Sequence, residues 1–112
     1  MRKEFNTLER FADFDSVERV NFLDSDDILV PPYKRACFCF DYCLPDERCV
    51  MINGGKKGKS VRQVARKIYE YYLSVEDEMC GHSVEDLSLD TIVKTQNATK
   101  LSPAYYNVDF SS

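Results

Sequence analysis

The stretch from Glu47 to Val75 constrains the fold more than any other part of the chain. It starts with a short β-type run, continues with a loop rich in glycine and lysine, and ends in a helical pattern. Ser60 and Gln63 have the spacing of a capping box, which predicts where the helix begins. The residues after this cap repeat with the period of an amphipathic helix ending near Ser74, and its apolar stripe comprises Val61, Val64, Ala65, Ile68, Tyr72 and Val75.

A β-hairpin is predicted directly before this helix. Residues 33–43 read YKRACFCFDYC, which is rich in aromatic side chains and alternates near its end. Turn-forming residues 44–47 separate this run from a returning strand at 48–53.

A four-residue loop in this hairpin predicts which residues face one another. Tyr42 is expected opposite Cys49, and Phe40 opposite Met51. These pairs would form an aromatic and sulfur-containing face on the core side.

The N-terminal third has weaker patterns. The apolar spacing in residues 1–15 fits a short helix, and residues 17–23 fit a strand. A second short strand is expected at Ile28–Val30, where Pro31 and Pro32 stop it.

The chain after the main helix is predicted to contain a short helix over 83–89 and strands at 91–93 and 104–110. The length of the whole chain, 112 residues, fits one domain. We therefore expect an α+β fold in which an antiparallel β-hairpin or small sheet packs against one main amphipathic helix. Residues 1–32 are interpreted as an N-terminal arm or partly packed segment, and residues 33–112 as a single small domain.

Charge is distributed unevenly along the chain. The net charge is −4, but residues 56–67 carry six basic side chains and no acidic one. Residues 1–32 sum to −4 and residues 68–112 to −6, while residues 33–55 balance. Overall acidity disfavours a general nucleic-acid coating role, whereas a local basic face suits a phosphate or an acidic partner.

The basic loop is close to a phosphate-binding P-loop. Gly58-Lys59-Ser60 matches the end of that motif, but Asn53 stands where the motif has its first glycine, and Gly54 is one residue too close. The segment after the helix is also too short and polar to supply the remaining parallel strands. A basic connection in which Ser60 caps the helix is favoured, and nucleotide or nucleic-acid binding through residues 53–60 remains an alternative.

The five cysteines are interpreted as free thiols in a reducing, intracellular compartment, because the charged N-terminus lacks the apolar core of a signal peptide. A zinc-stabilised module using Cys43, Cys49, Cys80 and His82 is a further alternative, although the usual paired zinc knuckles are absent. Buried cysteines that behave as small apolar residues are favoured. The prediction is therefore no metal and no cofactor.

No catalytic site is predicted, because His82 is the only histidine and has no partner at a spacing that indicates nucleophilic catalysis. The chain also lacks an apolar run long enough to cross a membrane.

The order of hairpin, basic turn and helix carries two resemblances. The helix reads Ser60-Val61-Arg62-x-Val64-x-x-x-Ile68-Tyr69-x-x-Tyr72. Residues 33–75 resemble the hairpin–helix half of β-grasp (ubiquitin-like) domains. They also resemble short uncharacterised proteins of large DNA viruses. The second resemblance implies a viral or virion-associated protein located in the host cytoplasm or the virion, and neither family has catalytic residues to transfer.

The sequence therefore predicts a non-enzymatic binding or interaction protein. Protein partners or self-association are favoured over nucleic acid, and no membrane contact is expected. The residues expected to bind an anion or an acidic partner lie in the basic loop and helix: Lys56, Lys57, Lys59, Ser60, Arg62, Arg66 and Lys67.

Overall fold

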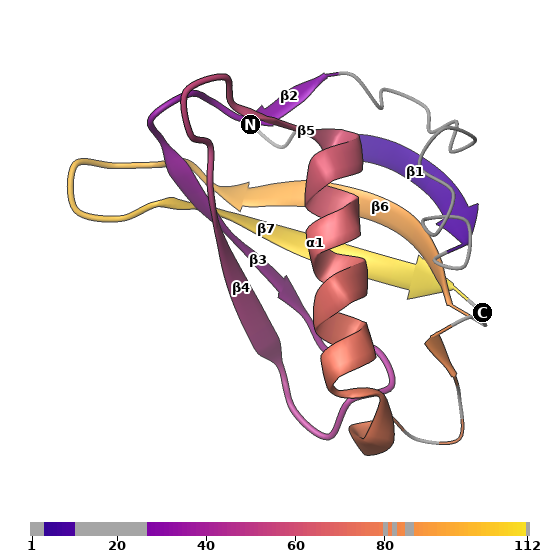
Figure 1. Ribbon diagram of the computed structural model, residues 1–112. Helices are drawn as coiled ribbons and strands as arrows, with labels where there is room; N and C mark the ends of the chain where they lie inside the picture. The colour runs from indigo at the N-terminus through magenta and orange to yellow at the C-terminus, as the bar shows by residue number, and fades with distance from the viewer. Residues whose placement is uncertain (1–3, 11–26, 80, 82, 85–86, 112) are drawn as a thin grey trace.

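The computed structural model describes residues 4–10, 27–79, 81, 83–84 and 87–111. A five-stranded sheet in the order β1-β6-β7-β3-β4 has helix α1 across one face, and a two-stranded sheet, β2-β5, lies near the start of that helix (Figure 1). This arrangement confirms the predicted α+β class. The elements are β1 (Glu4–Arg10), β2 (Ile28–Val30), β3 (Arg35–Phe40), β4 (Arg48–Asn53), β5 (Lys59–Ser60), α1 (Val61–Ser74), a short 3-10 helix η3 (Glu76–Glu78), β6 (Ser88–Gln96) and β7 (Ala104–Ser111).

Helix α1 begins and ends where the sequence predicts. The Ser60 hydroxyl accepts a hydrogen bond from the Gln63 N–H at 3.3 Å, and the Ser60 N–H donates to the Gln63 side chain at 2.9 Å. This capping box satisfies two N–H groups that a helix start leaves without partners. The buried side of the helix consists of Val61, Val64, Ala65, Ile68, Tyr69 and Tyr72.

The predicted hairpin forms between β3 and β4, but the predicted register is wrong. Cys39 lies opposite Cys49, and Cys37 opposite Met51. The connection runs from residue 41 to residue 47 and contains a turn in which the Leu44 N–H bonds the Asp41 carbonyl at 3.0 Å. Because this connection is longer than four residues, the pairing shifts by three positions and no aromatic–sulfur face forms.

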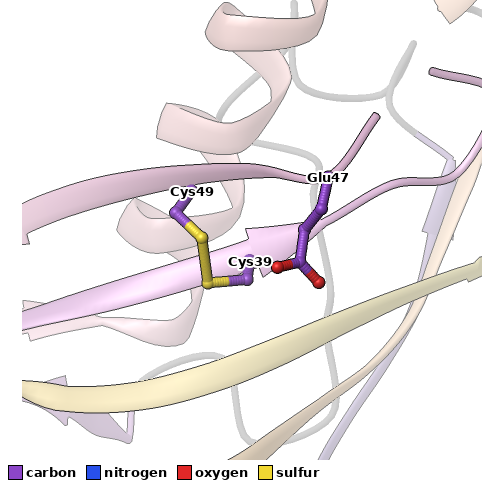
Figure 2. Close-up of side chains that lie close together, drawn as sticks. All are labelled: Cys39, Glu47 and Cys49. Atoms are coloured by element: carbon purple, nitrogen blue, oxygen red, sulfur yellow. A yellow bond between two sulfur atoms is a disulfide. The ribbon is translucent and has the colours of Figure 1, made fainter. Parts of the chain in front are cut away.

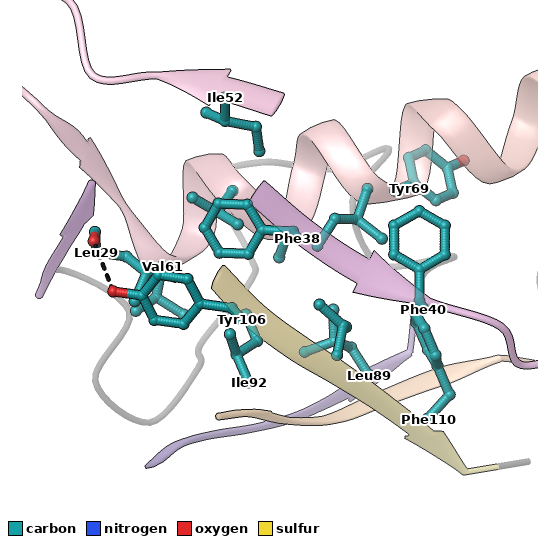
Figure 3. Close-up of a cluster of buried hydrophobic side chains, with 14 of the residues drawn as sticks. Leu29, Phe38, Phe40, Ile52, Val61, Tyr69, Leu89, Ile92, Tyr106 and Phe110 are labelled. Atoms are coloured by element: carbon teal, nitrogen blue, oxygen red, sulfur yellow. Dashed lines mark hydrogen bonds between the residues drawn. The ribbon is translucent and has the colours of Figure 1, made fainter. Parts of the chain in front are cut away.

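Alternate residues of β3 point to opposite faces of the sheet, as in any strand. Phe38 and Phe40 are buried on the face that α1 covers (Figure 3). The Phe38 ring stacks on Tyr106 with centroids 4.8 Å apart, and Phe40 lies 5.1 Å from the Tyr72 ring. Aromatic side chains from both hairpins and the helix thus fill the core.

Strands β6 and β7 pair antiparallel and form a second hairpin. This hairpin meets the β3–β4 hairpin within the sheet, where β3 and β7 run parallel. The predicted strands at 91–93 and 104–110 are confirmed within β6 and β7. The expected short helix over 83–89 is wrong at Ser88 and Leu89, which open β6 instead. Burial of Leu89 against the core outweighs the local cap signal; residues 85 and 86 lie outside the described residues.

The N-terminal strands join the rest of the chain. Residues 4–10 form β1, which pairs with β6, so the helix expected over residues 1–15 is wrong there. An irregularity in the pairing between Asn6 and Glu9 interrupts the alternation by which a regular strand is recognised in sequence. The strand expected at 17–23 lies outside the described residues. Strand β2 forms as expected and pairs with β5, and the boundary proposed at residue 32 stays a prediction.

The buried hydroxyl of Tyr72 on α1 makes the stability of the fold depend on pH. Its hydroxyl donates to the Tyr42 carbonyl at 2.9 Å, and burial raises the pKa of the phenol above its ordinary value. The unfolded chain therefore loses this proton first, so stability is fully present below about pH 10 and falls as pH rises further. We expect wild type to lose more unfolding free energy between about pH 8 and 10.5 than Tyr72→Phe, measured by urea denaturation. An equal loss in both proteins would contradict this assignment.

Candidate binding site at the basic end

The glycines of the basic loop allow close backbone packing. A Cβ atom on Gly54 would lie 2.0 Å from the Pro31 carbonyl oxygen, and one on Gly58 would lie 2.8 Å from the Val30 carbonyl oxygen. Gly58 also has a φ of 80°, in the left-handed region that favours glycine. The glycine content that resembles a P-loop is therefore explained by contact with residues 30–31.

Four backbone N–H groups at the two ends of the loop donate hydrogen bonds within the chain. The Gly54 N–H donates to the Lys34 carbonyl at 2.7 Å, and the Val61 N–H donates to the Asp27 carbonyl at 3.0 Å. The N–H groups of Ser60 and Gln63 are used in the capping box. A phosphate-binding loop needs such groups to point at its ligand, so these four donors are not available to an anion.

The residues predicted to bind an anion fall into separate groups. Lys56 and Lys57 are exposed in the loop between β4 and β5. Lys59, Arg66 and Lys67 come together along a shallow groove of about 260 Å³, which Gln63 and Glu70 also line. Ser60 serves as the helix cap, and Arg62 does not line this groove.

A larger cleft, which the sequence did not predict, lies at the same end of the molecule. Its volume is about 940 Å³, and its walls come from residues 31–36, the start of the β4–β5 loop and the connection between β6 and β7. Four basic residues line it, and none of its described lining residues is acidic: the basic ones are Lys34, Arg35, Lys94 and Lys100. The groove on α1, in contrast, also contains the acidic side chain of Glu70.

Apolar side chains are also exposed along the cleft. Leu101 is 96% exposed, Tyr33 79% and Ile28 50%. Tyr33 has a φ of 61°, and its N–H donates to the Gly55 carbonyl at 2.8 Å, so the β2–β3 connection is fixed to the basic loop. The cleft thus offers both positive charge and apolar surface to a ligand.

The floor of the cleft is part of the core. The Tyr106 hydroxyl donates to the Leu29 carbonyl at 3.3 Å, and burial raises the pKa of this phenol (Figure 3). The Lys94 ammonium lies 5.6 Å from the centre of the Tyr106 ring, a favourable cation–π distance. One cationic side chain of the cleft therefore lies against a buried aromatic ring of the core.

Acidic residues gather at the opposite end of α1. There Arg48 bonds Asp46 at 2.8 Å and Glu78 at 2.7 Å, joining the β3–β4 connection to η3. Its guanidinium also donates to the Tyr71 hydroxyl at 3.0 Å. We call this the acidic end (Asp46, Glu47, Glu76, Asp77 and Glu78). The basic end comprises the cleft and the β4–β5 loop. The β4–β5 loop lies near the start of α1, whereas η3 follows the end of this helix (Figure 1).

The cysteines depart from the prediction of free thiols. Cys39 and Cys49 form a disulfide across the hairpin, so that prediction is wrong for this pair (Figure 2). Cys37 and Cys43 do not take part in this disulfide, and Cys43 packs against the core. Cys80 and His82, the other proposed zinc ligands, lie outside the described residues.

No family model, curated protein or solved structure matches the chain. The resemblances to β-grasp domains and to proteins of large DNA viruses remain predictions. None of the helices in the described residues is long and apolar enough to span a membrane.

Proposed function

We propose that the protein is a non-catalytic binding protein whose basic end holds an acidic segment of another polypeptide. The observation that carries this proposal is the cleft that Lys34, Arg35, Lys94 and Lys100 line without an acidic residue among the described lining. Carboxylates of a partner would neutralise these cations. The adjacent Lys56 and Lys57 extend the same positive surface.

The apolar residues of the cleft favour a peptide over a nucleic acid. Leu101 and Ile28 are aliphatic and suit the apolar side chains of a polypeptide. Proteins that bind single-stranded nucleic acid stack successive bases on aromatic side chains, and Tyr33 is the one exposed aromatic residue among the described lining. The acidic end would also repel a long polyanion.

The predicted interaction is modest and sensitive to salt. Exposed charge pairs contribute about 0.2–1 kcal/mol each and weaken as ionic strength rises. The apolar contacts add affinity that salt does not screen. We therefore expect roughly micromolar binding at low ionic strength.

A pair of charge-reversal variants tests the location of the site. Lys94→Glu with Lys100→Glu changes the cleft, while Arg66→Glu with Lys67→Glu changes the groove on α1. Each double variant shifts the net charge from −4 to −8, since each of its two substitutions removes one positive charge and adds one negative charge. The probe is a fluorescent peptide of alternating glutamate and leucine, followed by anisotropy.

We expect the cleft variant to lose at least about tenfold in affinity, because two reversals cost about 1.4 kcal/mol or more. The α1 variant should lose less than about threefold in affinity, because only its change in net charge weakens the attraction to the peptide. Equal losses in the two variants, or a larger loss in the α1 variant, would contradict binding in the cleft. Tighter binding of a single-stranded oligonucleotide than of the peptide would contradict the choice of partner.

A further inference from the structure

The face of the hairpin that points away from α1 carries a row of sulfur atoms. Cys39 and Cys49 are directly opposite each other with their Cα atoms 4.1 Å apart, which is near the spacing of a non-hydrogen-bonded pair. The next cross-strand pair places the Cys37 Sγ 3.7 Å from the Met51 Sδ. Nothing in the proposed binding function uses this cluster.

A carboxylate completes the cluster. Glu47 lies two residues before Cys49, and Figure 2 shows its side chain directed toward Cys39. A Glu47 carboxylate oxygen and the Sγ atoms of Cys39 and Cys49 all lie within 4.8 Å of one another. Thiolates and carboxylates are zinc ligands, and three protein ligands leave the fourth tetrahedral position open to water.

We propose that this cluster is a zinc site when the disulfide is reduced. Two molecules of a low-molecular-weight thiol supply two electrons and two protons that break the Cys39–Cys49 bond, giving two protein thiols and one disulfide of the reductant. Zn²⁺ then displaces both thiol protons and forms two Zn–S bonds, and the Glu47 carboxylate supplies the third protein ligand. The disulfide and the zinc-bound form exclude each other, because a disulfide has no thiolate to donate.

The sheet holds the ligands together in both states. Backbone pairing of β3 with β4 fixes the two Cα atoms, so both sulfurs stay on one face after reduction. Cys49 is exposed on strand β4 at the edge of the sheet, where a reductant and a metal ion have access. Cys39 is only 8% exposed, which shields one side of the site from solvent.

Metal titration of the full chain tests the proposal. The protein is reduced with a phosphine, desalted without oxygen and titrated with Co²⁺, whose tetrahedral thiolate complexes absorb characteristically in the ultraviolet and visible. We expect these bands to appear, to vanish when Zn²⁺ is added, and to be absent from the oxidised protein. Native mass spectrometry should show one zinc ion per reduced chain.

Variants separate this site from other metal binding. Cys49→Ser should abolish the cobalt bands, and Glu47→Gln should weaken zinc binding by at least about tenfold, since even groups outside the metal's direct ligands contribute 10–100-fold. Cys43→Ser is the control and should bind zinc as wild type does, because Cys43 packs against the core. Circular dichroism establishes that each variant is folded.

Three results would overturn the proposal. The first is a reduced, folded wild-type protein without cobalt bands. The second is binding that persists in Cys49→Ser. The third is binding that survives Glu47→Gln but is lost in Cys80→Ser or His82→Ala, which would assign the metal to other residues.

Discussion

Replacing Gly54 by alanine is expected to destabilise the protein by about 2–4 kcal/mol. The new Cβ would lie 2.0 Å from the Pro31 carbonyl oxygen and 3.2 Å from that of Val30. Both contacts are to backbone, so relief requires the β4–β5 loop to move away from the β2–β3 connection. That movement would also strain the hydrogen bond from the Gly54 N–H to the Lys34 carbonyl.

Gly55→Ala is the matched control in the same loop. Gly55 has a φ of 66°, but a Cβ there would meet nothing within 4 Å. Gly55→Ala should therefore lower the free energy of unfolding by about 1 kcal/mol, because only the left-handed backbone conformation disfavours alanine there. Urea denaturation followed by circular dichroism measures both variants. A Gly54→Ala protein within about 0.5 kcal/mol of wild type would show that the loop does not pack on residues 30–31.

Phe38→Ala is expected to cost about 3–5 kcal/mol of unfolding free energy. The Phe38 side chain is completely buried and stacks on Tyr106, so truncation leaves a cavity between the central strands and α1. Tyr106 also forms the floor of the cleft, so the cavity would loosen the residue that supports Lys94.

Met51→Ala on the neighbouring strand tests the register of the hairpin. Met51 is 44% exposed and lies on the face away from α1, opposite Cys37. Its truncation should cost less than about 1 kcal/mol. In the register predicted from the sequence, Met51 would instead face the core opposite Phe40. A loss from Met51→Ala as large as that from Phe38→Ala, measured by urea denaturation, would therefore contradict the observed pairing.

The helix could be predicted closely because its signals are local. The capping box at Ser60 and Gln63 and the apolar stripe that follows lie within one continuous segment. The bounds of β4 could also be predicted from a local signal, because the turn residues 44–47, which include a proline, directly precede it. The alternation of the first hairpin strand also predicted correctly that Phe40 lies in the core.

Long-range pairing could not be predicted from such signals. The hairpin register depends on the conformation of residues 41–47, including Cys43 at a φ of 59°, which composition alone does not indicate. Strand β1 forms by pairing with β6, more than 75 residues away along the chain, whereas the local spacing indicated a helix. In both places tertiary contacts override the local pattern.

The candidate site was predicted only in part. The basic loop was recognised from its lysines, but the cleft joins Lys34 and Arg35 to Lys94 and Lys100, which are distant in sequence. The parallel pairing of β3 with β7 brings these segments together. The glycines that suggested a phosphate loop allow backbone packing, and the cysteine pair becomes evident only from the observed register.

Amide chemical-shift mapping of the isotope-labelled protein tests the central claim most directly. The glutamate–leucine peptide is added at low ionic strength, and the shifts of the backbone amides are followed. We expect the largest changes at the cleft, in residues 33–36 and 94–102, and the loss of these changes in the Lys94→Glu, Lys100→Glu variant. Changes centred on Arg66 and Lys67, or spread evenly over the surface, would contradict the assignment of the cleft as the binding site.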